Sequence, residues 1–429
     1  MSTQTFWLAR ALARQGHGVH VVTNSSGIES SYRQCFFGTD QDILVGTDPS
    51  TRLDLRVTSE VPPQSYIPYA PPYATQIFGL ARSVLEEHPC DAIFAWYLEP
   101  YGFVAAALGL ASAVPVFIRH AGSDLGRLSA NRELREAYSW AMNVATGLIV
   151  TNEQEFARCY GTIDRPRLGL RRACLPTDFT GDGDRMNIAE VSGVASAWLG
   201  DHRMPAALVT EIRQINDKAF DENSFTIGSY GKIGESKGSF DLIAALTRLA
   251  ERGATFNFLT IAAGSQTTVE RYYRSVLHSR ALADRTWILP PLAPWRIPSF
   301  LRRCQVVCFL ERDFPISFHG PVIPREILSS GACLVCSLEI ARKKEYGSGL
   351  VDRRTAMVIE DPRLSDVLAS RLLELLVNPD LAWAIGHQGQ LLFRCWEEDL
   401  TSIDDVARGF IQDIGSRAAA PARDRSAIQ

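Results

Sequence analysis

Short runs of apolar, β-branched residues alternate with longer amphipathic segments along almost the whole chain. This alternation predicts strand–helix units and parallel sheets. In the first half, the predicted strands are Val19–Thr23, Leu53–Val57, Ala92–Trp96, Val114–Ile118 and Gly147–Val150, and the predicted helices include Thr5–Gln15, Tyr73–Glu87 and Arg132–Thr146.

The alternation stops over Leu175–Glu222, which has no clean strand signal, and then restarts. The predicted strands of the second half are Phe225–Ser229, Phe256–Ala262, Thr286–Leu289, Gln305–Leu310, Cys333–Ser337 and Met357–Ile359. The predicted helices are Ser239–Arg252, Val269–Ala281, Ile297–Cys304, Arg325–Ser330, Leu364–Leu376 and Pro379–His387.

We therefore predict an α/β protein of two doubly wound, Rossmann-like domains that face each other across a cleft. The expected parts are an N-terminal domain (1–175), a connection with some helix (176–222), a C-terminal domain (223–395), a helix that returns towards the N-terminal domain (396–416) and a disordered tail (417–429). A doubly wound domain opens with a strand, but this chain opens on a helix, with no room for a strand before Thr5. We expect the first strand to be missing.

Composition and charge argue against several classes of protein, among them nucleic-acid-binding, membrane-spanning and secreted proteins. The formal net charge is −4, so no general basic field attracts nucleic acid. The longest nearly uncharged run, Phe103–Ile118, has 16 residues and includes Pro115. A spanning helix needs about 20 residues, so this run predicts a buried helix followed by a strand. The arginine-containing opening helix does not resemble a signal peptide, and nine scattered cysteines fit a reducing compartment. We expect a cytoplasmic protein, with contact to a membrane surface left open.

Lysine is rare in this chain, and two of the five lysines lie in one glycine-rich loop. Lys232 and Lys237 stand in Gly228–Gly238, between a predicted strand and a predicted helix. Glycines let the backbone approach a ligand, and the helix N-terminus together with two lysines favours an anion such as a diphosphate. The spacing fits neither the dinucleotide fingerprint nor the Walker pattern. A solvated turn with two surface lysines is the alternative.

A second loop precedes a predicted helix at Arg325. Pro324 suits a helix start, and Glu326 falls in the first turn, where the helix dipole favours a carboxylate. Such a carboxylate can accept two ribose hydroxyls, or it can be purely structural.

A third loop, Arg119–Asp124, follows a predicted strand and places His120 and Asp124 where they can meet a polar ligand. A loop histidine satisfied by its neighbours is the alternative. The pairs Cys304/Cys308 and Cys333/Cys336 have spacings near those of zinc sites, but they lie in apolar runs and predict buried structural thiols. We predict no metal site and no cofactor.

The three loops, in this order on two α/β domains, resemble the group 4 family of retaining glycosyltransferases, which have the GT-B fold. The resemblance covers most of the chain and rests on TFWLARALARQGHGVHVVT, RHAGSDL, SYGKIGESKGSFDLIAAL, IPSFLRRCQVVCFL and HGPVIPREILSSGACLVCS. It implies transfer of a sugar from a nucleotide-diphosphate donor to a hydroxyl acceptor, with retention and without a metal.

The resemblance also implies roles for single residues. Lys232, Lys237 and Gly231 would hold the diphosphate, and Glu326 would bind the ribose. His120 would lie near the sugar, and Asp124 would shape its loop. The remaining residues implied on the donor side are His319, Gly320 and Gly331, of which Gly331 would allow close helix–strand packing.

Two features depart from the family. Phe318 stands where the first glutamate of the Glu-x7-Glu motif is expected, with Glu311, Asp313 or the backbone of His319 and Gly320 as substitutes. The first strand and its glycine loop are also missing. A non-catalytic or degraded nucleotide-sugar-binding protein of the same fold is therefore the alternative function. The acceptor stays unknown, although the tyrosines of 66–73 could stack on a sugar.

Overall fold

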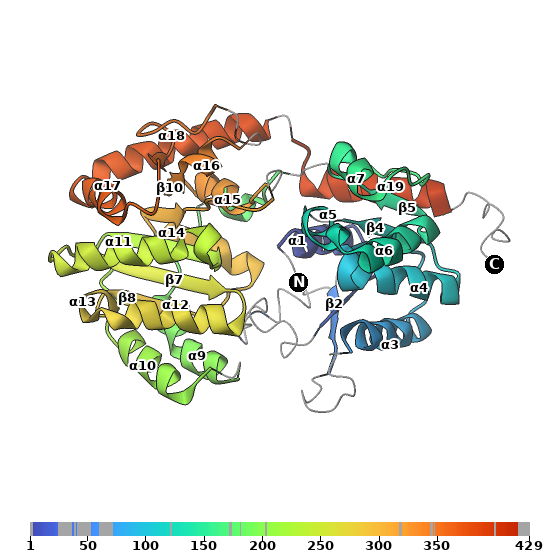
Figure 1. Ribbon diagram of the computed structural model, residues 1–429, viewed down its shortest axis with the longest axis horizontal. Coiled ribbons are helices and arrows are strands. Elements are labelled where there is room, and N and C mark those ends of the chain that lie inside the picture. The colour runs from blue at the N-terminus through green and yellow to red at the C-terminus, as the bar shows by residue number, and fades with distance from the viewer. Residues whose placement is uncertain are drawn as a thin grey trace.

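The computed structural model describes the elements from Thr3 to Ala418, and two groups of elements stand side by side in it (Figure 1). The residues that the structure describes are 3–24, 37, 40, 53–59, 72–120, 122–170, 174–180, 182–201, 204–316, 320–343, 346, 348–398 and 400–418.

The C-terminal group is built on one parallel sheet of six strands. Its order is β11-β10-β9-β6-β7-β8, so the first strand in sequence lies near the middle and the order reverses between β6 and β9. The strands are β6 (Thr226–Lys232), β7 (Asn257–Ala263), β8 (Thr286–Leu289), β9 (Val306–Phe309), β10 (Cys333–Ser337) and β11 (Met357–Ile359).

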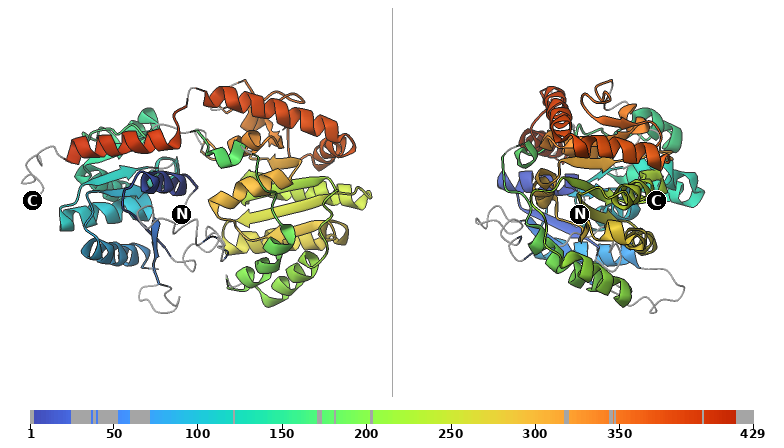
Figure 2. Two further views of the ribbon diagram at one scale, coloured as in Figure 1. Left: turned by 180° about the vertical axis from the view of Figure 1, so that it is seen from behind. Right: turned by 90° about the vertical axis from the view of Figure 1, so that its left-hand side faces the viewer.

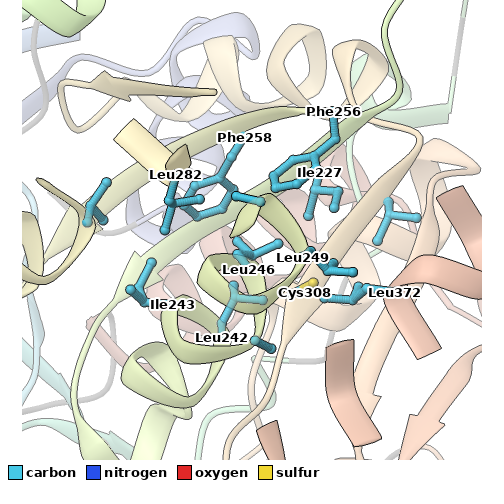
Figure 3. Packing of buried hydrophobic residues seen from close by; sticks show 14 of the residues in the cluster. Ile227, Leu242, Ile243, Leu246, Leu249, Phe256, Phe258, Leu282, Cys308 and Leu372 are labelled. Atoms are coloured by element: carbon cyan, nitrogen blue, oxygen red, sulfur yellow. The ribbon is translucent and has the colours of Figure 1, made fainter. Parts of the chain in front are cut away.

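Alternate side chains of this sheet enter two hydrophobic clusters, one on each face. Val306 packs in one cluster and Val307 in the other, and Leu334 and Val335 divide in the same way. Figure 3 shows Leu242, Leu246 and Leu249 among the side chains of the first cluster. The helices of the group are α9 (Ile188–Asp201), α10 (Ala206–Asn216), α11 (Ser239–Glu251), α12 (Gln266–His278), α13 (Arg280–Ala283), α14 (Ile297–Arg303), α15 (Ile323–Ser330), α16 (Leu338–Ala341), α17 (Ser365–Val377) and α18 (Pro379–Glu397).

The N-terminal group has two separate small sheets. Strands β1 (Val19–Thr23) and β2 (Leu53–Val57) pair with each other, and β3 (Ile93–Trp96), β4 (Val116–Arg119) and β5 (Gly147–Ile149) form the other sheet in this order. All pairs are parallel. The larger helices are α1 (Thr3–Arg14), α3 (Tyr73–Glu87), α4 (Phe103–Ser112), α6 (Arg132–Val144) and α7 (Glu153–Tyr160).

Helix α19 (Ile403–Ala418) joins the two groups. It follows α18 and packs against α1 (Figure 2). Leu8 and Ala11 of α1 form one hydrophobic cluster with Ala407 of α19. Among the helices that the structure describes, none combines the length and apolar character that crossing a bilayer requires.

The predicted strands are confirmed within one to three residues at each end, as is a helix followed by a strand in Phe103–Ile118. One helix prediction was too short: α18 continues ten residues past His387 to Glu397, because Gly389 and Phe393 face the core in the same helical period. The predicted connection also contains α9 and α10, which pack on each other and on β8. We propose that both helices be assigned to the C-terminal domain.

Candidate functional site

A cleft of about 2090 Å³ lies where the strand ends of the two groups meet. Open α/β sheets bind ligands at the carboxyl ends of their strands, next to the point where the strand order reverses. Of the residues singled out from the sequence, five line this cleft: His120, Gly231, Lys232, Gly320 and Glu326.

Gly231 and Lys232 end strand β6, which is longer than the sequence predicts. Gly231 has a φ of +108°, and a Cβ there would lie 2.5 Å from Cδ1 of Ile323 at the start of α15. Glycine therefore lets β6 approach α15 closely. Lys232 is exposed at the cleft, so its ammonium group can meet a ligand anion.

Lys237 lies behind the cleft wall in the short helix η6 (Glu235–Lys237). It forms an ion pair with the fully buried carboxylate of Glu311, and its Nζ lies 3.6 Å from the ring centroid of Phe314. Burial lowers the pKa of Lys237, and Glu311 opposes that shift. Lys343 reaches the other oxygen of Glu311 at 3.2 Å. One carboxylate thus holds two lysines beside the loop.

Glu326 lies in the first turn of α15 and is buried. Its Oε2 accepts a hydrogen bond of 2.7 Å from the hydroxyl of Tyr230 on β6. Burial raises the pKa of Glu326 to about 7, although the Tyr230 bond favours the ionised form. The Tyr230–Glu326 hydrogen bond connects β6 to α15 close to Lys232, the last residue of β6. The Glu326 carboxylate therefore already accepts one hydroxyl donor.

His120 directly follows β4 and is 3% exposed. Its Nε2 accepts a hydrogen bond of 3.1 Å from the backbone N–H of Thr151, so Nδ1 carries the proton of the neutral ring. Asp124 lies in α5 (Gly122–Gly126), behind the cleft wall, where Oδ2 accepts from the backbone N–H of Leu98 at 3.1 Å. The histidine faces the cleft, and the aspartate fastens the loop after β3 to the loop after β4.

Gly331 also lies behind the wall, where it ends α15 with a φ of +79°. A Cβ on Gly386 of α18 would lie 2.2 Å from the carbonyl oxygen of Gly331, so α18 packs directly on this turn. Glu311, the suggested substitute for the missing glutamate, is sequestered by two lysines, and Asp313 is exposed. His319, Phe318 and most of the tyrosine-rich 66–73 lie outside the described residues.

Sequence reasoning missed three cleft residues: Arg119, Glu99 and Tyr230. The Arg119 guanidinium lies 4.0 Å from the ring centroid of Trp96, and burial lowers the pKa of Arg119. Glu99, in the loop after β3, accepts a hydrogen bond of 2.7 Å from the hydroxyl of Tyr138. All three stand at or just after strand ends, and that position was the signal that could have found them.

Among the residues that the structure describes, one group could offer three metal ligands: His20, Asp54 and His88. Asp54 already accepts hydrogen bonds of 2.9 Å from His20 and from Arg56. The Arg56 guanidinium thus already balances the negative charge of Asp54, a role that a metal cation would otherwise have. The four core cysteines 304, 308, 333 and 336 are buried, as predicted.

Comparisons with known proteins agree with this geometry. Residues 1–167 match the family model described as glycosyl transferase 4-like domain. No curated protein matches the chain. HepE from Anabaena, solved with UDP and glucose, is similar in structure with a TM-score of 0.55 at 14% identity, covering 97% of this chain and 96% of that chain.

Two further solved structures are similar over nearly their whole length. Sucrose-phosphate synthase from Thermosynechococcus elongatus has a TM-score of 0.55 at 12% identity, covering 94% of this chain and 100% of that chain. A glycosyltransferase from Rickettsia africae has a TM-score of 0.54 at 11% identity, covering 97% and 94%. The chain therefore has the GT-B fold of these glycosyltransferases, and its residues 1–167 match the glycosyl transferase 4-like family model.

Proposed function

We propose that this protein is a glycosyltransferase that takes its sugar from a nucleoside diphosphate donor, with UDP as the nucleotide, and transfers it with retention to a hydroxyl acceptor. The observation that supports this proposal most directly is that Lys232 and Glu326 line one cleft at the end of β6, with Lys237 behind its wall. UDP is favoured because the similar HepE structures hold UDP or UDP-glucose.

In this proposal the donor's diphosphate lies against the loop after β6. Lys232 supplies an exposed positive charge, and Gly231, which lines the cleft beside it, lets β6 pack closely on α15. Lys237, with its pKa lowered by burial and supported by Glu311, adds a second charge at short range. Positive charge at a leaving diphosphate stabilises the charge that develops as the glycosidic bond breaks. Lysine charge takes the place of a metal in this mechanism.

Glu326 binds the ribose once the Tyr230 hydroxyl moves aside or shares the carboxylate. A ribose offers two hydroxyl donors, and an ionised carboxylate accepts both. His120 contributes its Nδ1–H side towards the sugar because Nε2 is engaged with Thr151. Gly320, which lines the cleft, contributes a backbone N–H group near the sugar, and Gly331 keeps the turn after α15 compact.

The transfer breaks the bond between the anomeric carbon and the phosphate oxygen and forms the bond to the acceptor oxygen on the same face. The acceptor proton passes to the departing phosphate, so no separate protein base is required. Glu99 and Arg119 line the N-terminal wall of the cleft and are our candidates for acceptor contacts. The acceptor is a hydroxyl compound such as a glycan, a lipid-linked sugar or a small natural product, and contact with a membrane surface would fit a lipid-linked one.

Calorimetric titration with UDP, GDP and ADP tests the donor site. Loss of a charge-assisted phosphate contact costs about 1.5–3 kcal/mol, so Lys232→Ala should weaken UDP binding by roughly 10- to 150-fold. Arg274→Ala is the matched control, because this exposed arginine pairs with Glu270 on α12 and does not line the cleft. Equal affinity of Lys232→Ala and the parent would overturn the assignment.

A non-catalytic nucleotide-sugar-binding protein is the second candidate, and Phe318 in place of a motif glutamate favours it. The two functions predict the same UDP titration but different chemistry. Release of UDP from UDP-glucose, followed by chromatography with and without Lys232→Ala, separates them. Turnover that depends on Lys232 removes the non-catalytic candidate, and tight binding without turnover supports it.

A further inference from the structure

Arg119 places a positive charge on the N-terminal wall of the cleft. It is the last residue of β4 and lies opposite Trp96 of β3 in the parallel register. Both residues line the cavity, and the guanidinium lies over the Trp96 ring, 4.0 Å from its centroid. An arginine stacked on an aromatic ring keeps the edge of its planar group, with its N–H donors, free to bind. The stack therefore orients Arg119 for a ligand.

Arg119 has no anionic partner among the residues that the structure describes. No carboxylate pairs with its guanidinium, no acceptor takes a hydrogen bond from it, and its nitrogens are still open to solvent. Two carboxylates of the neighbouring loops bond elsewhere: Asp124 accepts from the backbone N–H of Leu98, and Glu99 accepts from the Tyr138 hydroxyl. Burial lowers the pKa of Arg119, but an arginine stays protonated in proteins. A full charge thus lies partly desolvated in the cleft.

A charge of this kind favours an anionic ligand. Moving a guanidinium out of water costs free energy, and that cost stays unbalanced until an opposite charge lies beside it. The planar guanidinium matches the two oxygens of a carboxylate or a phosphate, and such charge-assisted pairs are stronger than neutral hydrogen bonds. A neutral hydroxyl compound cannot balance the charge. The cleft therefore favours a compound that brings a carboxylate or a phosphate to Arg119.

The backbone beside Arg119 is held in an unusual conformation. Tyr97 directly follows β3 and lines the cavity with a φ of +80°, which is rare for a residue with a bulky side chain. Its N–H donates to the carbonyl of Arg119 at 2.9 Å, and its own carbonyl accepts from the N–H of Gly102 at 2.9 Å. Backbone outliers of this kind gather at ligand sites, where the surrounding structure holds them in place. The Tyr97 conformation is an independent sign that this wall binds a ligand.

The same wall offers groups for the rest of an acceptor. Glu99 is exposed in the cavity, and the Tyr101 hydroxyl lies 3.2 Å from Oγ1 of Thr23. Carboxylate and hydroxyl groups bind the hydroxyls of a ligand. His120, next to Arg119 in the chain, lines the same cavity, and consecutive Cα atoms are about 3.8 Å apart. One small molecule can therefore reach Arg119 with its anionic group and the proposed sugar position with a hydroxyl.

We propose that Arg119 determines acceptor specificity, and that the acceptor is an anionic hydroxyl compound whose carboxylate or phosphate group binds to the guanidinium stacked on Trp96. The inference rests on the proposed glycosyl transfer and adds the charge of the acceptor to it. Lys232, on the donor side, ends β6 of the C-terminal group, whereas Arg119 ends β4 of the N-terminal group. Arg119 is therefore assigned to the acceptor and not to the diphosphate.

Calorimetric titration with two matched pairs of probes tests the charge of the acceptor. The pairs are glucose with glucuronate and glycerol with glycerol 3-phosphate, each at constant ionic strength and on protein saturated with UDP. The anionic member of at least one pair should bind about 10-fold or more tightly than the neutral member, because it gains charge-assisted hydrogen bonds. A preference in the first pair identifies a carboxylate, and a preference in the second pair identifies a phosphate.

Three variants show whether Arg119 causes the preference. Arg119→Gln removes the charge, so it should bring the two members of each pair within about 2-fold of each other and leave UDP affinity unchanged. Arg119→Lys keeps the charge without the planar group and should keep part of the preference. Arg274→Ala removes an exposed arginine of α12 outside the cavity lining and should keep all of it.

Two results would overturn the inference: a parent that binds the anionic probes no more tightly than the neutral ones, or an Arg119→Gln variant that keeps the preference. A loss of UDP affinity in Arg119→Gln as large as that in Lys232→Ala would also overturn it, because Arg119 would then belong to the donor site. Titration of the probes without UDP separates the two proposals. Absence of UDP binding contradicts the proposed function, whereas the preference for anions at Arg119 is measured independently of UDP.

Discussion

The two groups of elements differ in how their strands are paired: the C-terminal group has one sheet, and the N-terminal group has two smaller ones. The C-terminal sheet has six paired strands, and β7 to β10 are almost entirely buried. The N-terminal strands are divided into a pair and a triplet, and four of the five residues of β1 are only half-buried. The buried six-stranded sheet carries the proposed donor site, whereas the proposed acceptor side is built on the two smaller sheets that line the same cavity.

The largest expected contrast lies between the two loop lysines. Lys237→Ala removes one of the two lysines that pair with the buried Glu311, and breaking a buried pair costs about 3–5 kcal/mol. Lys232 is exposed, and changes at exposed positions usually alter stability by no more than about 0.5 kcal/mol, so Lys232→Ala should mainly lower UDP affinity. Urea unfolding of both variants measures this. Equal destabilisation by the two changes would contradict the assignment of Lys237 to the packed wall.

Glu326 should link stability to pH within the six-stranded sheet. Its folded pKa of about 7 lies above the ordinary value of 4.5, so the folded protein holds this proton more tightly than the unfolded chain. The stabilisation is full below pH 4.5 and is lost as pH rises through 7, at about 1.4 kcal/mol per pKa unit. Glu326→Gln should flatten the fall of Tm between pH 4.5 and 7.

UDP affinity should change with pH in the opposite sense, because ribose hydroxyls donate to the ionised carboxylate. The parent should bind more tightly as pH rises through about 7, and Glu326→Gln should bind weakly at every pH. A variant that retains the parent's pH profile would remove Glu326 from the ribose site.

Two glycines with a left-handed backbone conformation, one in each group of elements, allow the tightness of packing to be compared. Gly238 has a φ of +65°, and a Cβ there would lie 2.3 Å from the carbonyl oxygen of Leu310. Gly16, after α1, has a φ of +86° and nothing within 4 Å of such a Cβ. The left-handed backbone conformation should lower the stability of each alanine variant by about 1–2 kcal/mol. The close contact with Leu310 should lower the stability of Gly238→Ala by about 1–3 kcal/mol more. Equal loss of Tm in both variants would show that the β6 loop is looser than described.

The smallest expected effect is the difference in stability cost between two valine-to-alanine variants, one from each group of strands. Val307 on β9 is fully buried, so Val307→Ala should cost about 2 kcal/mol. Val21 on β1 is half-buried and lines the cavity, and Val21→Ala should cost less than about 1 kcal/mol. Chemical denaturation gives both values. If the two costs are equal, β1 is as well packed as β9 and the contrast between the sheets fails.

Hydrophobic periodicity predicted nearly every strand, because burial of alternate side chains leaves a local signal. The periodicity predicted β6 too short, because Tyr230, Gly231 and Lys232 have a loop-like sequence but continue the pairing with β7. Contacts between distant segments left no such signal. The Lys237–Glu311 pair joins residues 74 positions apart, and the Tyr230–Glu326 bond joins residues 96 positions apart.

Hydrogen exchange of the whole chain with and without UDP tests the central claim most directly. The account predicts that saturating UDP slows exchange in two segments of the six-stranded sheet, residues 230–238 after β6 and residues 320–331 around α15, and leaves β1 and β3 unchanged. Lys232→Ala should remove this protection at the same UDP concentration, and Arg274→Ala should keep it. Protection confined to the N-terminal strands, or none at UDP concentrations that calorimetry shows to be saturating, would contradict the account.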